Sequence, residues 1–126
     1  MILVDTSIWI DHLRATDKKL VEFLEAGRVL AHRFVVGELA LGNFRGRDLV
    51  LNALADLPQA SVATDQEVLH FINRHALYGI GIGYIDAHLL AAARLTADGS
   101  LWTRDKRLHA AADRLGLSLA APEDRL

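Results

Sequence analysis

The sequence of 126 residues predicts an α/β protein, a three-layer α/β/α sandwich around a mostly parallel central sheet. Two observations support this prediction. Short apolar segments alternate with longer segments of helical periodicity along the whole chain. The first apolar segment, residues 1–4, is continuous rather than alternating, which is typical of a strand buried on both faces of a parallel sheet. Because no internal repeat, linker or low-complexity segment interrupts the pattern, we expect one domain over residues 1–126.

The first half of the chain begins with the strand at residues 1–4. A short helix is expected from Ser7 to Arg14, capped by Thr6 or Ser7. Asp17 is expected to cap a second helix that ends at Gly27. The other elements expected here are a strand at 29–31, a helix apolar almost all round at 34–41, and an amphipathic helix at 48–57 that Pro58 stops.

The second half begins with a weak strand at residues 60–63. Thr64 and Glu67 then form a capping box that opens a helix through about residue 76. A glycine-rich connector at 79–83 leads into the next helix. The remaining expected elements are that helix at 84–97, a strand at 100–103, a helix at 105–115, a strand at 117–120 and a loosely ordered tail at 121–126.

Composition limits the classes of protein that this chain can represent. The sequence has no cysteine, which excludes disulfides, thiol nucleophiles and cysteine-based zinc sites. Met1 leads directly into the first strand without a secretory signal, and no apolar run reaches the roughly 18 residues of a membrane span. We therefore expect a soluble cytoplasmic protein. The net charge of −2 provides no global attraction to nucleic acid, although a local basic rim remains open around Arg104, Lys106 and Arg107.

Three carboxylates stand in apolar surroundings, where a charge is costly unless it is paired or ligated. Asp5 follows the first strand, and Glu38 and Asp86 lie inside apolar helical segments. A fourth, Asp105, stands at the carboxyl end of another strand, where ligands bind in parallel sheets. Each has a structural alternative: Asp5 and Asp105 as helix caps, Glu38 on an exposed helix edge, and Asp86 in a favoured first-turn position.

Together, these carboxylates favour a site for a divalent cation. Carboxylates that converge repel one another and raise one another's pKa values, and a cation between them removes that conflict. Oxygen-only ligation favours Mg²⁺ or Mn²⁺. The hydroxyls of Thr6, Ser7 and Thr103 would then hold the carboxylates or the ligating waters, although capping is their alternative role.

Other sites are less well supported by the residues. The six histidines show no metal-binding spacing, and the glycines at 79, 81 and 83 do not form a dinucleotide-binding motif. A phosphohydrolase that uses Asp5 as its nucleophile would need a second aspartate two residues later, where Ser7 stands.

On these residues, the sequence resembles the PIN domain family of nucleases, and more closely its VapC-type toxins of bacterial toxin–antitoxin pairs. The resemblance extends over essentially the whole chain. It is carried by four blocks that occur in order: Ile2–Ile10, Val35–Leu39, Ile85–Ala93 and Leu101–Leu108. The resemblance implies an acidic quartet of Asp5, Glu38, Asp86 and Asp105 and cleavage of RNA that depends on Mg²⁺ or Mn²⁺. It also implies homodimers and a cognate antitoxin that inhibits by inserting a segment near the active site.

The function that we predict from the sequence is a metal-dependent endoribonuclease. The metal, held by the four carboxylates directly or through water, would activate a water in line with the scissile phosphate. Arg104, Lys106 and Arg107 are candidates for contacts to phosphates, with a plain solvated surface as the alternative. The alternative function is a catalytically silent binding module that only pairs with a partner protein.

Overall fold

The computed structural model describes residues 1–119. Its core is a three-stranded parallel sheet in the order β2–β1–β3. The strands are β1 (Ile2–Val4), β2 (Val29–Leu30) and β3 (Ser100–Trp102). Because β1 lies between two parallel neighbours, it is buried on both faces, as its uninterrupted apolar run predicts.

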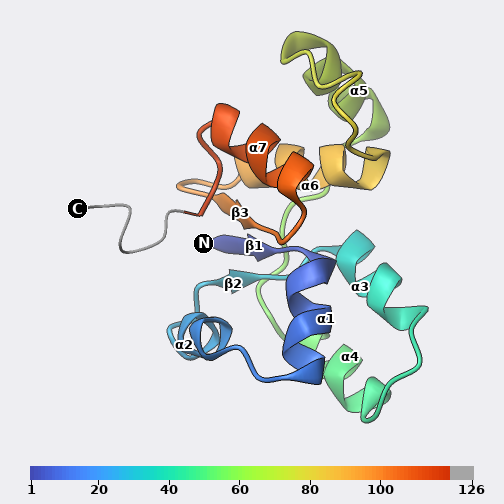
Figure 1. Cartoon of the computed structure of the whole chain (residues 1–126), viewed down its shortest axis with the longest axis vertical. Coiled ribbons are helices and arrows are strands. Elements are labelled where there is room, and N and C mark those ends of the chain that lie inside the picture. The colour runs from blue at the N-terminus through green and yellow to red at the C-terminus, as the bar shows by residue number, and fades with distance from the viewer. Residues whose placement is uncertain (120–126) are drawn as a thin grey trace.

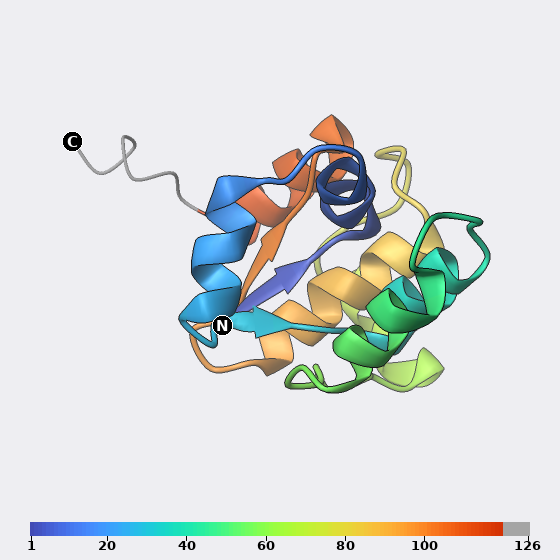
Figure 2. The same cartoon turned by 90° about the horizontal axis from the view of Figure 1, so that it is seen from below.

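Helices cover both faces of this sheet (Figure 1). Viewed along two perpendicular directions, α5 and α6 lie on the side opposite α1 and α2, and α7 lies beside β3 (Figures 1 and 2). The helices are α1 (Thr6–Arg14), α2 (Lys18–Glu25), α3 (Arg33–Ala40), α4 (Arg47–Ala55), α5 (Asp65–Arg74), α6 (Tyr84–Leu95) and α7 (Lys106–Arg114). The predicted three-layer α/β/α architecture is therefore confirmed.

Most helix boundaries follow local signals in the sequence. Asp17 accepts a hydrogen bond from the backbone N–H of Leu20 at the start of α2, and Thr64 and Glu67 form the expected capping box of α5. The prediction for the first helix is wrong in its cap. Asp5, rather than Thr6 or Ser7, occupies the N-cap position of α1, and its side chain makes no capping hydrogen bond.

Two predicted strands are reduced to single bridges. In place of a strand at 60–63, Gln59 makes one parallel bridge to Ala31. In place of a strand at 117–120, Ser118 makes one parallel bridge to Leu101, and residue 120 lies outside the described residues. The expected tail at 121–126 also lies outside them.

The sheet and α6 together position the candidate site. Residues Ala87–Ala93 of α6 are all buried because the helix packs against β1 and β3. The carboxyl ends of β1 and β3 point to the same edge, where α1 and α6 begin (Figure 1). Polar side chains that follow these two strands are therefore brought close together. None of the helices in the described range has the length and apolar character that crossing a membrane requires.

Candidate active site

Asp5 is held by hydroxyl groups. Its side chain is 8% exposed, and its Oδ2 accepts hydrogen bonds from Ser7 Oγ at 2.8 Å and from Thr103 Oγ1 at 2.7 Å. Since neither bond involves a backbone N–H of α1, the carboxylate does not act as a helix cap. Buried polar groups need hydrogen-bond partners, and these two hydroxyls supply them for Asp5 and fix its orientation.

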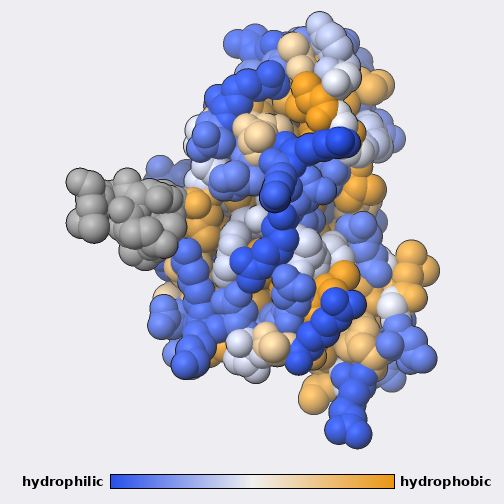
Figure 3. Space-filling view, in the orientation of Figure 1, coloured by the Kyte–Doolittle hydropathy of each residue, from blue (hydrophilic) through white to orange (hydrophobic). Residues whose placement is uncertain are grey.

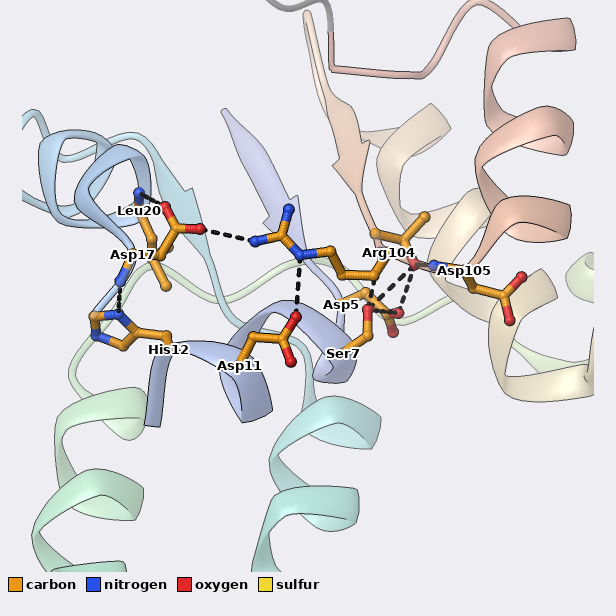
Figure 4. Close-up of polar contacts among 9 residues, drawn as sticks. Asp5, Ser7, Asp11, His12, Asp17, Leu20, Arg104 and Asp105 are labelled. Atoms are coloured by element: carbon orange, nitrogen blue, oxygen red, sulfur yellow. Dashed lines mark hydrogen bonds and ion pairs between the residues drawn. The ribbon is translucent and has the colours of Figure 1, made fainter. Parts of the chain in front are cut away.

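The same hydroxyls join the ends of β1 and β3. Thr103 Oγ1 accepts the backbone N–H of Asp105 at 3.0 Å, and Ser7 Oγ accepts that of Arg104 at 3.0 Å. The two hydroxyl oxygens lie 3.4 Å apart. Figure 4 shows this network between the first turn of α1 and the segment that leads into α7. Ser7 and Thr103 thus have the carboxylate-holding role that the sequence predicts for them, but the carboxylate that they hold is Asp5 alone.

Glu38 lies on α3 beside the start of α1. Thr6 donates its hydroxyl hydrogen to Glu38 Oε1 across 2.8 Å, which links the two helices next to Asp5. The side chain of Glu38 is exposed, although its neighbours in the sequence are apolar. The alternative, a carboxylate on an exposed helix edge, describes its burial correctly.

Asp86 carries the clearest electrostatic sign of a shared site. Its side chain is half-buried in the first turn of α6, and its Oδ2 accepts the backbone N–H of Gly83 at 2.9 Å. Burial raises the pKa of the Asp86 carboxyl, and the negative charges of Asp5 and Asp105 raise the pKa further, against the lowering effect of the Gly83 hydrogen bond. Three carboxylates from different parts of the chain are therefore close enough to influence one another.

Asp105 takes part in two interactions, a helix cap and a charge effect on Asp86. It is exposed, it caps α7 by accepting the backbone N–H of Leu108 on Oδ1 at 2.9 Å, and its charge acts on Asp86. In Figure 4 its carboxylate points away from the Arg104 side chain. The capping role that the sequence left open is therefore real, and it does not prevent the charge of Asp105 from acting on Asp86.

The carboxylates do not form a compact cluster. Within residues 1–119, no three Asp, Glu or His side chains stand close enough together to hold one metal ion. The donor set still fits a hard divalent cation in its chemistry, because it consists of carboxylate and hydroxyl oxygens and because the negative charges of Asp5 and Asp105 act on Asp86. Direct ligation of one ion by several of them would require the side chains to move closer together.

The basic residues of the predicted rim have different surroundings. The Arg104 guanidinium pairs with Asp11 at 3.1 Å and with Asp17 at 2.8 Å (Figure 4). It also lies over the Trp102 ring. The side chains of Arg107 and Lys106 are exposed. Lys106 and Arg107 are thus the more accessible candidates for phosphate contacts.

We did not predict from the sequence the two ion pairs of Arg104 or the two buried histidines, His32 and His88. His32 caps α3, its Nδ1 accepting the backbone N–H of Phe34 at 3.0 Å, and it is fully buried together with His88. The Phe34 ring lies against both imidazoles. The position of His32 directly before a helical segment was the one local signal that could have identified this cap.

Comparison with known proteins agrees with this fold. The model of the PIN domain family matches residues 2–114. Two curated relatives, named ribonuclease VapC32 and coming from the H37Rv and CDC 1551 strains of Mycobacterium tuberculosis, are each 51% identical to this chain over 120 residues. The matched region covers 95% of this chain and 97% of each relative. The chain therefore belongs to the PIN domain family, among its VapC-type members.

Proposed function

We propose that this protein is a Mg²⁺-dependent endoribonuclease and the toxin of a toxin–antitoxin pair. The observation that carries the proposal is the pKa of Asp86 at the carboxyl edge of the sheet, which burial raises and which the charges of Asp5 and Asp105 raise further. The name ribonuclease, borne by relatives that are 51% identical over 95% of this chain, supports RNA as the substrate.

Mg²⁺ or Mn²⁺ bound among these carboxylates would supply an activated water and neutralise charge on the scissile phosphate. Asp5 is oriented for this role by Ser7 and Thr103, which both donate to its Oδ2. Asp86 is oriented by the N–H of Gly83. Glu38 lies on α3, and its Oε1 is held by Thr6.

The test compares the purified wild-type protein with Asp5→Asn and Asp86→Asn on structured RNA in the presence of Mg²⁺. We expect cleavage by the wild type, loss of cleavage in both variants, and loss of cleavage by the wild type in EDTA. Asp98→Asn is the matched control, because Asp98 is an exposed turn residue with φ +52°, a conformation that asparagine adopts readily. Full activity of both site variants would contradict the proposed site.

A second experiment addresses the target. The ends of cellular RNA are mapped after brief induction of the wild type and, separately, of Asp5→Asn. We expect new ends that appear only with the wild type. If the two maps are identical, the proposal of a cellular endoribonuclease is wrong.

The remaining parts of the proposal concern partners. The likeness to VapC-type proteins supports a cytoplasmic homodimer and a cognate antitoxin. The exposed Leu41 and Leu49, with 90% and 76% of their surface accessible, are the kind of residue that such partners cover. Light scattering after size-exclusion chromatography tests the dimer. Co-purification with the product of the gene immediately upstream tests the antitoxin.

The silent binding module is the second candidate, because the described carboxylates do not form a ready-made metal cluster. It predicts retained partner binding with no cleavage of any class of RNA by the wild type under Mg²⁺ or Mn²⁺.

A further inference from the structure

A cavity beside the start of α6 is lined by two exposed aromatic rings. It has a volume of about 240 Å³ and lies between the end of α5, the loop of residues 77–83 and the first turn of α6. Tyr78 and Tyr84, which line it, are 66% and 44% exposed. Rings of this size are usually packed more deeply, because each carries a large apolar surface. The two tyrosines therefore present free surface that an aromatic ligand can cover.

The cavity adjoins the candidate active site through Gly83. This glycine lines the cavity, and its backbone N–H donates to Oδ2 of Asp86 across 2.9 Å. One residue thus forms the wall of the cavity and holds a carboxylate of the site. A strand with its scissile phosphate at the carboxylates would place a neighbouring nucleotide beside this wall.

Tyr84 is fixed in orientation. Its hydroxyl donates to Asp65 Oδ1 across 2.8 Å, and its ring meets that of His88 edge to face, with 4.8 Å between the ring centroids. A ring that is already held in place loses little freedom when it stacks against a ligand. Tyr78 makes no hydrogen bond through its side chain and no ring contact within residues 1–119, so its ring is available.

Two glycines set the backbone shape of the loop. Gly79 and Gly81 have φ values of +73° and +84°, which residues with a side chain rarely adopt. A Cβ atom at Gly81 would lie 2.6 Å from Nη1 of Arg107, so the guanidinium rests directly on the loop. In the described part of the chain, no carboxylate pairs with Arg107. A cation is therefore available for the phosphate of a nucleotide whose base enters the cavity.

We propose that this cavity is a subsite for one unpaired nucleobase of the RNA substrate, which stacks against Tyr78 and Tyr84 while Arg107 contacts a flanking phosphate. The subsite rests on the proposed ribonuclease function and adds to it the recognition of single-stranded RNA next to the cleaved bond. Stacking on aromatic side chains and cationic contacts to the backbone are the general means by which proteins bind single strands.

The test uses a single-stranded oligoribonucleotide that contains a site cleaved by the wild type, with Mg²⁺. We expect Tyr78→Ala to raise KM about tenfold and to leave kcat within about twofold, because stacking holds the ground state and the transition state alike. Tyr78→Phe, which keeps the ring, is expected to retain the wild-type KM. Leu95→Ala is the matched control, since Leu95 is an exposed residue at the last turn of α6 outside the cavity.

Abasic substitution of the RNA, one position at a time, identifies the nucleotide that occupies the cavity. At one position beside the cleaved bond, the abasic substrate should raise the KM of the wild type about tenfold and have no further effect on Tyr78→Ala. An unchanged KM in Tyr78→Ala, with cleavage by the wild type intact, would overturn the subsite and leave the proposed function standing.

A change of oligomeric state in Tyr78→Ala, seen by light scattering and without a position-specific abasic effect, would also overturn it, in favour of a second copy covering the cavity. RNA that the wild type leaves intact would refute the proposed function and the subsite together.

Discussion

Thr103 donates its hydroxyl hydrogen to Oδ2 of Asp5 across 2.7 Å, although the two residues are 98 positions apart in the chain. Both are 8% exposed. The bond forms because β1 and β3 are parallel neighbours in register, with Val4 opposite Trp102. Asp5 follows Val4 and Thr103 follows Trp102, so the two side chains lie next to each other. The orientation of the candidate catalytic carboxylate therefore depends on the pairing of the first and last strands.

Replacing Thr103 by valine tests this dependence. Thr103→Val keeps the shape of the side chain but removes the donor to Asp5 and the acceptor for the N–H of Asp105. We expect a loss of about 1–3 kcal/mol in the free energy of unfolding and of about 10- to 100-fold in kcat/KM for RNA cleavage. Thr103→Ser, which keeps the hydroxyl, should retain most of the wild-type free energy of unfolding and most of the wild-type kcat/KM. Wild-type cleavage by Thr103→Val would show that this hydrogen bond does not position Asp5.

Asp105 allows the capping role to be separated from the catalytic one. Asp105→Ser keeps an oxygen that can accept the N–H of Leu108 but removes the charge, so we expect stability near that of the wild type and a loss of activity on the order of 100-fold. Asp105→Ala should in addition lower the free energy of unfolding by about 1 kcal/mol. Chemical denaturation and RNA cleavage measure the two effects. An active Asp105→Ser would leave Asp105 with the capping role alone.

Asp86→Asn is expected to stabilise the fold while it removes activity. Burial and the charges of Asp5 and Asp105 raise the pKa of Asp86 above its ordinary value of 3.8, so the ionised carboxylate destabilises the folded state. The melting temperature of the variant in EDTA at pH 7 should exceed that of the wild type by about 3 °C. Because the unfolded chain releases this proton near its ordinary pKa of 3.8, the destabilisation begins near that pH and is complete once the pH exceeds the raised pKa, so the difference should vanish below about pH 4. A lower melting temperature for the variant at pH 7 would contradict the assigned repulsion.

Arg104 is expected to contribute more to stability than to RNA binding, because its guanidinium already holds Asp11 and Asp17. Burial alone would raise the pKa of Asp17, but the N–H of Leu20 and the Arg104 ion pair outweigh it and lower that pKa. This stabilisation is present above the unfolded pKa of about 3.8 and is lost as the pH falls below it.

Denaturation at several pH values and cleavage at several salt concentrations test this difference. Arg104→Ala should lose roughly 0.5–1 kcal/mol at pH 7 and less near pH 3. Lys106→Ala should instead raise KM for RNA and reduce the dependence of binding on salt. A larger rise in KM for Arg104→Ala than for Lys106→Ala would reverse this assignment.

His32 should make the fold sensitive to mild acid. Burial lowers the pKa of His32 to about 4, and the charges of His88 and Arg33 contribute to the shift. The unfolded chain therefore takes up this proton first, near the ordinary pKa of 6.5, and stability falls as the pH decreases from about 6.5 to about 4.

His32→Asn keeps a capping acceptor for the N–H of Phe34 but does not titrate. Its free energy of unfolding should be lower at pH 7, because the smaller side chain leaves a cavity, and should depend less on pH in this range. Urea denaturation between pH 4 and pH 7.5 provides the comparison. An equally steep dependence in the variant would show that other groups cause the acid sensitivity.

The sequence by itself determined the α/β class, the order of the helices and most helix starts, because helical periodicity and caps such as Asp17 and Thr64 are local signals. It overestimated the strands at 60–63 and 117–120, which are single bridges. The length over which an edge segment pairs depends on its neighbour in the sheet, and short apolar runs do not encode it.

The tertiary structure alone decided what each carboxylate contacts. Asp5 is a helix N-cap by position, but two hydroxyls hold its side chain, and one of them comes from the far end of the chain. Glu38 stands in an apolar sequence and is exposed, since the helix face on which a residue lies depends on what packs against it. Local patterns identify which residues are unusual, whereas strand pairing and helix packing decide which of them meet.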